Sequence, residues 1–132
     1  MIDEDTSRNS REVTSDVTRY LTKTQQLREA AMELHALLAD TIAGCDRVTS
    51  ALAEGCTVLE VVHAIEAQDG PTHRRDVHGA MRRFDQALKG SRGEFYRTLI
   101  NDGGTSVADV ARTVQLSAQM IRRLVRASEE AD

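Results

Sequence analysis

The sequence predicts an all-α protein, and three observations lead to this prediction. The chain of 132 residues has one proline, four phenylalanines and tyrosines in all, and no tryptophan, whereas Ala, Leu, Val, Arg and Glu are abundant. This composition favours helices over a sheet-based core. Apolar residues also recur at helical spacing in several segments, and the length suits one domain or two very small ones.

The N-terminal part predicts a flexible start followed by a long helix. Residues 1–12 carry six charged side chains and one apolar side chain after the initiator, so we expect a flexible N-terminus. From Val13 onward, apolar residues alternate at spacings of three and four, with Thr24 filling one position. We interpret this seam either as a dimer contact or as packing within the chain's own domain. Its members are Val17, Tyr20, Thr24, Leu27, Ala31, Leu34 and Leu38.

Glycines and capping residues divide the rest of the region 13–89 into shorter predicted helices. Gly44 is expected to end the first helix, and a short helix capped by Asp46 is expected to break at Gly55. The next helix starts at Thr57, ends near Asp69–Gly70, and buries Val58, Val61, Val62 and Ile65. A further helix begins near Pro71 and uses Val77, Met81, Phe84 and Leu88 as its apolar side.

The charge is distributed unevenly along the chain. The formal net charge is −4, but residues 1–70 carry six Lys or Arg against thirteen Asp or Glu, which gives −7. Residues 72–126 carry eleven basic against five acidic side chains, which gives +6. The second half is therefore the half that would face phosphate groups.

The C-terminal segment predicts a compact unit over residues 94–128, after a linker over 89–93. It begins with a short helix, Glu94–Asn101, and a glycine-containing break. A second helix, capped by Thr105 or Ser106, has an apolar stripe, and a tight connection over 115–117 leads to a third helix that Ser117 caps. The stripe consists of Val107, Val110, Ala111 and Val114, and Ile121 and Leu124 of the third helix point back towards it.

The segment Ser106–Val125 resembles the helix-turn-helix of bacterial regulators and sigma-factor DNA-binding regions. In that family a small residue lies where the helices cross, here Ala111, and apolar residues follow ten and thirteen positions later, here Ile121 and Leu124. The turn usually begins with glycine at a positive φ, and Gln115 at this position predicts modest strain or an altered turn.

The resemblance implies a three-helix, homeodomain-like unit that binds double-stranded DNA. Only six residues follow Arg126, so we expect no β-wing. Arginine can donate two hydrogen bonds to guanine and glutamine can pair with adenine in the major groove. We therefore expect base contacts from Gln119, Arg122 and Arg123, phosphate contacts from Arg126, Arg112 and Ser117, and Ala118 on the same exposed side.

A weaker internal similarity suggests a second, degenerate copy of this motif over residues 46–88. Thr57–Ile65 aligns with Ser106–Val114, and Met81–Phe84 parallels Ile121–Leu124. In a true repeat, Arg82 and Arg83 would contact a second DNA segment, or the copy would serve as a partner-binding or dimerising unit. The alternative is that any two amphipathic helices align this well.

Other functional classes find little support in the sequence. No apolar run approaches the ~20 residues that cross a bilayer, and the polar start is unlike a signal peptide, so we expect a cytoplasmic protein with no membrane partner. Cys45 and Cys56 are interpreted as small core residues, and the spacing of His73 and His78 is not that of a helical zinc pair. We expect no enzyme, catalytic residue, cofactor or metal, and a small-molecule effector is left open.

Two functions from different classes remain. The first is a small bacterial transcriptional regulator that acts as a homodimer and binds double-stranded DNA in a sequence-specific manner. The second is a protein-interaction module that retains the helix-turn-helix fold and contacts RNA polymerase or a sigma factor.

Overall fold

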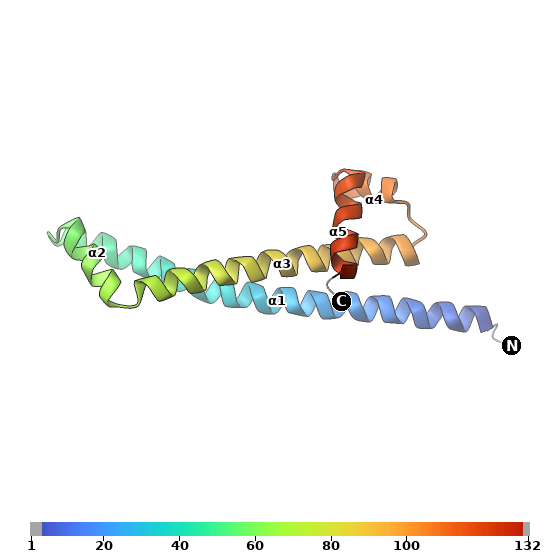
Figure 1. Cartoon of the computed structure of the whole chain (residues 1–132), viewed down its shortest axis with the longest axis horizontal. Helices are drawn as coiled ribbons and strands as arrows, with labels where there is room; N and C mark the ends of the chain where they lie inside the picture. The colour runs from blue at the N-terminus through green and yellow to red at the C-terminus, as the bar shows by residue number, and fades with distance from the viewer. Residues whose placement is uncertain (1–3, 131–132) are drawn as a thin grey trace. The chain divides into compact units, whose positions relative to one another are not determined.

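The structure is a computed structural model that describes the backbone of residues 4–130 and the side chains of residues 16–129. Regular secondary structure within residues 4–130 is entirely helical, which confirms the predicted all-α class (Figure 1). The helices are α1 (Glu4–Ala53), α2 (Val58–Ala67), α3 (Gly70–Asp102), α4 (Val107–Val114) and α5 (Ala118–Glu130).

The first helix is longer than the sequence predicts. Residues 4–12, which were expected to be flexible, belong to α1, while residues 1–3 lie outside the described part of the chain. The predicted end at Gly44 is wrong, because α1 continues to Ala53. A glycine inside a helix costs about 1 kcal/mol relative to alanine but does not by itself end the helix. The predicted break at Gly55 is confirmed, and that glycine has a φ of 100°.

The predicted linker over residues 89–93 is also absent, because α3 runs without a break from Gly70 to Asp102. The expected separate helix Glu94–Asn101 is the last part of this helix. Gly93 serves close approach rather than flexibility, because a Cβ atom added there would lie 2.2 Å from the carbonyl oxygen of Leu124 in α5. Such an approach is a tertiary feature that glycine alone permits at this position.

The chain divides into two compact units, and each is described by itself. The first, which we call the α5 unit, contains α4, α5, the part of α1 up to Arg28 and the part of α3 from Asp85 onward. The second, which we call the α2 unit, comprises Glu29–Phe84 and so contains α2 and the remaining parts of α1 and α3.

The hydrophobic core lies in the α5 unit. Tyr96 of α3, Val110 of α4, and Ile121 and Leu124 of α5 are all less than 10% exposed and pack as one cluster. Fully burying each such side chain contributes about 1.5–3 kcal/mol. The apolar stripes predicted on both short helices are confirmed, since Val107, Ala111 and Val114 pack against this cluster. Tyr96 is the member of this cluster that the spacing of apolar residues does not predict.

The members of the predicted seam on α1 differ in exposure. Tyr20, Leu27, Ala31 and Leu34 are half-buried, whereas Val17, Thr24 and Leu38 are exposed. The Tyr20 ring lies 5.6 Å, centroid to centroid, from the ring of Phe95 in α3, so part of the seam packs within the chain. Val13, where the seam was predicted to start, lies outside the residues whose side chains are described.

Candidate nucleic-acid interface

Local capping interactions fix both ends of the α4–α5 connection. The Ser106 hydroxyl accepts a hydrogen bond from the Asp109 amide at 3.1 Å and thereby caps α4. The Ser117 hydroxyl accepts from the Met120 amide at 3.0 Å and caps α5, as predicted. Each side chain satisfies an amide that has no partner inside its helix.

The turn between the helices begins at Gln115, which adopts the left-handed conformation with φ 59° and ψ 39°. The Gln115 and Leu116 amides both donate to the carbonyl oxygen of Ala111, and the Leu116 bond is 3.1 Å long. This is the conformation for which glycine is the usual residue, and a side chain there costs about 1–2 kcal/mol. The turn thus has ordinary geometry with a strained residue, which was one of the two predicted outcomes.

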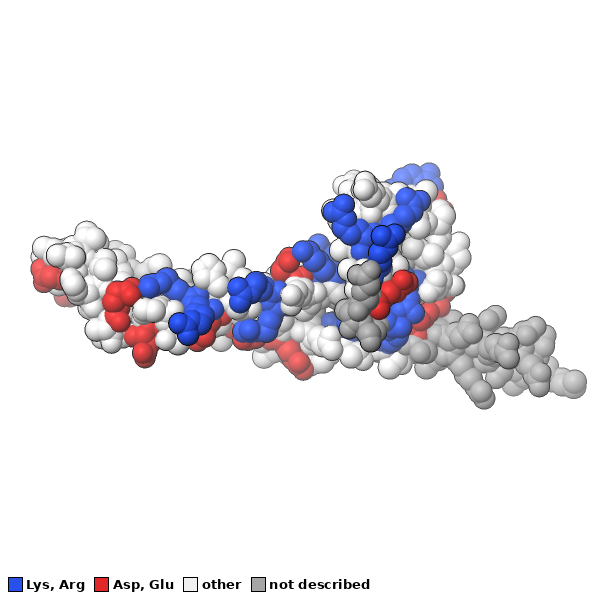
Figure 2. Space-filling view, viewed as in Figure 1, with Lys and Arg blue, Asp and Glu red and all other residues white. Residues whose placement is uncertain are grey.

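One face of α5 packs and the opposite face is exposed. Ile121 is fully buried and Leu124 is 8% exposed against the core. Gln119, Arg122, Arg123 and Arg126 are exposed, and their spacing of three and four places them on one side of the helix. Figure 2 shows basic side chains gathered over this helix. The three arginines make no ion pair with any residue whose side chain is described, so their donors remain available.

The other predicted contact residues have different surroundings. Ala118 is half-buried at the start of α5, and the Ser117 hydroxyl can still donate its hydrogen while it caps the helix. Arg112 is exposed, but its guanidinium forms an ion pair with Asp109, one turn earlier in α4. Hydrogen bonds from Ser106 and then Arg112 hold the pKa of Asp109 below its ordinary value of 3.8. Arg112 is therefore engaged within the chain, unlike the arginines of α5.

A buried carboxylate, missed by the sequence analysis, joins α5 to the rest of its unit. Glu94 of α3 is fully buried, and its Oε1 atom accepts hydrogen bonds from Ser128 Oγ at 2.9 Å and Arg19 Nη2 at 3.0 Å. Arg97 Nη1 also donates to this oxygen at 3.4 Å. Three helices thereby meet at one side chain, since Ser128 lies in α5 and Arg19 in α1. This network fixes the C-terminal half of α5 while the arginine face stays exposed.

The packing of α4 against α5 is not repeated in the segment that was predicted as a degenerate copy. Thr57 caps α2 much as Ser106 caps α4, with the hydroxyl accepting from the Glu60 amide at 3.2 Å. However, no residue of α2 is buried. In the alignment, Val61 of α2 corresponds to Val110 of α4, and Val110 is 1% exposed. Arg83, one of the two arginines proposed for a second DNA contact, forms an ion pair with Glu33 of α1.

Three other expectations concern the cysteines, a metal site and membrane crossing. Cys45 and Cys56 are free and exposed, so their interpretation as core residues is wrong. Among the residues that the structure describes, no three His, Cys, Asp or Glu side chains gather as a metal site requires. The described helices, including the 50-residue α1, are too polar or too short to cross a membrane.

Comparison with known proteins gives no match, because no family model, curated protein or solved structure is similar to the chain at a significant level.

Proposed function

We propose that the protein binds double-stranded DNA by placing α5 in the major groove. The observation that carries this proposal is the exposed side of α5, where one glutamine and three arginines lie on a helix whose other side is packed. Arg122 and Arg123 would donate to guanine, Gln119 would pair with adenine, and Arg126 and the Ser117 hydroxyl would contact phosphates.

The proposal extends to a small bacterial transcriptional regulator that works in the cytoplasm as a homodimer. A single recognition helix buries little surface, and two copies would read two half-sites. The positive charge of residues 72–126 supports attraction to the phosphate backbone despite the overall charge of −4.

Selection of bound duplexes from a random library tests sequence-specific binding directly. The expected result is a recurrent motif that contains guanine and adenine positions. Changing Arg122 or Arg123 to alanine should then relax one position each and weaken binding by about 1–3 kcal/mol. Recovery of no enriched sequence, with binding unchanged in both variants, would contradict base readout by α5.

A second candidate function is a contact with RNA polymerase or a sigma factor through the same end of the unit. It is favoured by Leu116 in the turn and Met120 on α5, which are each 37% exposed. If this function is the correct one, changing both residues to serine should abolish capture of RNA polymerase. Under the DNA proposal the same variant should keep its affinity for duplex DNA.

A further inference from the structure

The α2 unit has many exposed apolar side chains and almost no core. Among the described residues of this unit, Ala80 is the one hydrophobic residue that is buried. Val58 and Leu59 of α2 are each 66% exposed, and Ile42 of α1 is 63% exposed. Surface apolar residues are ordinary when they are scattered, but a contiguous set on one unit marks an interaction surface.

The polar contacts that the structure gives within this unit lie at its surface. Arg74 pairs with Glu66, Arg83 pairs with Glu33, and the Thr41 hydroxyl lies 2.9 Å from His73 Nε2. All three contacts are exposed, and exposed pairs of this kind contribute little to folding. A ten-residue helix such as α2 is not stable in water unless it packs on something. A partner that covers the exposed apolar side chains would supply the additional apolar burial.

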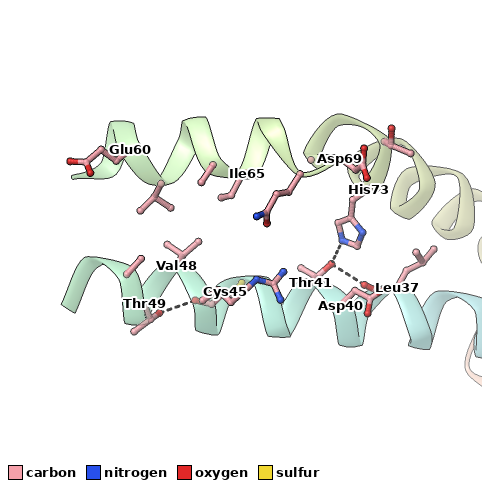
Figure 3. Close-up of a pocket in the computed structure, with 18 of the residues that line it drawn as sticks. Leu37, Asp40, Thr41, Cys45, Val48, Thr49, Glu60, Ile65, Asp69 and His73 are labelled. Carbon is pink, nitrogen blue, oxygen red and sulfur yellow. Dashed lines mark hydrogen bonds between the residues drawn. The ribbon is translucent and has the colours of Figure 1, made fainter. Parts of the chain in front are cut away.

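Exposed side chains of α1, three of them large and apolar, form a regular stripe beside an open cavity. Leu38, Ile42, Cys45, Thr49 and Leu52 are all exposed and alternate at spacings of four and three. That spacing suits a helix that packs against another helix along its length. The cavity has a volume of about 1000 Å³ and lies between α1, α2 and the start of α3. Figure 3 shows Val48 and Ile65 facing each other across it, and Cys45 and Thr49 also line it.

The charges of the unit favour a second copy of the chain as the partner. Residues 29–53 of α1 carry four acidic side chains and one arginine, whereas residues 70–84 of α3 carry four arginines and one aspartate. Arg75, Arg82, Asp40 and Asp46 are exposed and make no ion pair or hydrogen bond with the described residues. A surface with unpaired charges of both signs is self-complementary when two copies meet about a two-fold axis.

We infer that the α2 unit is the dimerisation surface, with the stripe on α1 and the apolar face of α2 covered by the same surface of a second copy. This inference deepens the proposed function, because it locates the contact that would join two DNA-reading helices. It also moves that contact from the N-terminal seam to residues 38–65.

Two matched substitutions on α1 test this assignment. Ile42 and Leu21 are exposed to similar extents, 63% and 60%, but Ile42 lies in the α2 unit and Leu21 in the α5 unit. Sedimentation equilibrium without DNA should show a dimer for the natural chain at micromolar concentration. Ile42→Glu should weaken association about 100-fold or more, because it buries an unpaired charge in the interface, and Leu21→Glu should leave it unchanged. A monomeric natural chain, or dissociation caused by Leu21→Glu as well, would overturn the inference.

Alkylation of Cys45 provides a second test. It uses the natural chain, so it does not depend on whether a variant folds. Cys45 is exposed in the single chain and lies on the stripe, so its alkylation should slow at least tenfold as the protein concentration rises through the dimerisation range. Equal alkylation rates at low and high concentration would contradict the inference. DNA binding is measured separately: an Ile42→Glu monomer that still binds a half-site duplex supports the DNA proposal whatever the fate of the dimer.

Discussion

Ser128 Oγ in α5 donates a 2.9 Å hydrogen bond to Glu94 Oε1 in α3, and both residues are fully buried. The same oxygen accepts from Arg19 of α1, so the contact lies at the junction of three helices. A buried carboxylate is tolerated only when it is paired and hydrogen-bonded. The orientation of α5, and with it the direction of its arginine face, depends on this junction.

Replacing Glu94 should therefore destabilise the protein more than replacing Ser128. Glu94→Ala leaves Arg19 and Arg97 without their shared carboxylate and should lower the free energy of unfolding by about 3 kcal/mol. Ser128→Ala removes one hydrogen bond to a charged group and should cost about 1.5 kcal/mol. Urea unfolding of both single variants and the double variant measures these values. If the two losses simply add, the residues do not act through one contact.

Two glycines of α3 should respond in opposite ways to alanine. At Gly93 a Cβ atom would lie 2.2 Å from the Leu124 carbonyl oxygen, so Gly93→Ala should cost about 2–3 kcal/mol. At Gly90 the nearest atom would be Lys23 Cδ at 3.8 Å, which is an ordinary contact. Gly90→Ala should therefore stabilise the helix by up to about 1 kcal/mol. Thermal unfolding of the two variants provides the comparison, and destabilisation by Gly90→Ala would show that α3 is not packed as described.

Gln115 should be improved by glycine, because its φ of 59° is strained for any residue with a Cβ atom. The gain should be about 0.5–1 kcal/mol, since glycine also loses more conformational freedom on folding. Gln119→Gly, the same change inside α5, is the control and should cost about 1 kcal/mol. Loss of stability in Gln115→Gly would rule out the left-handed turn.

The carboxyl group of Asp109 should titrate below its ordinary value of 3.8, chiefly because Ser106 donates a hydrogen bond to the side chain and secondly because Arg112 is adjacent. A lowered pKa in the folded state means that the contacts of the Asp109 carboxylate contribute their full stability above pH 3.8 and lose it as the pH falls through the lower value. Nuclear magnetic resonance titration should show that Ser106→Ala raises this pKa more than Arg112→Gln does. An unchanged pKa in both variants would refute the assigned contacts.

The parts of this fold that could be predicted are those that local sequence determines. The valine stripe of α4, the caps at Ser106 and Ser117, and the inward direction of Ile121 and Leu124 follow from spacing within a few residues. They position the exposed face of α5 correctly, because each side of a short amphipathic helix is defined by its own residues.

Glu94 could not be predicted in the same way. A glutamate beside glycines and arginines is typical of a solvated surface. Its burial depends on hydrogen bonds from Arg19, 75 positions earlier, and from Ser128, 34 positions later. The sequence around Gly93 is typical of a linker because no neighbouring residue indicates the contact that Gly93 makes. Its close contact with Leu124 exists only once α5 lies against α3.

The exposed arginines of α5 are proposed to bind duplex DNA, and the salt dependence of binding shows whether they do. Fluorescence anisotropy with a genomic duplex pool should give an affinity that falls steeply as salt rises. Changing Arg126 to alanine should reduce the slope of log affinity against log salt by about 1, whereas Arg92→Ala, an exposed arginine of α3, should leave it unchanged. Binding that is absent at low salt, or equally reduced by Arg92→Ala and Arg126→Ala, would contradict the claim.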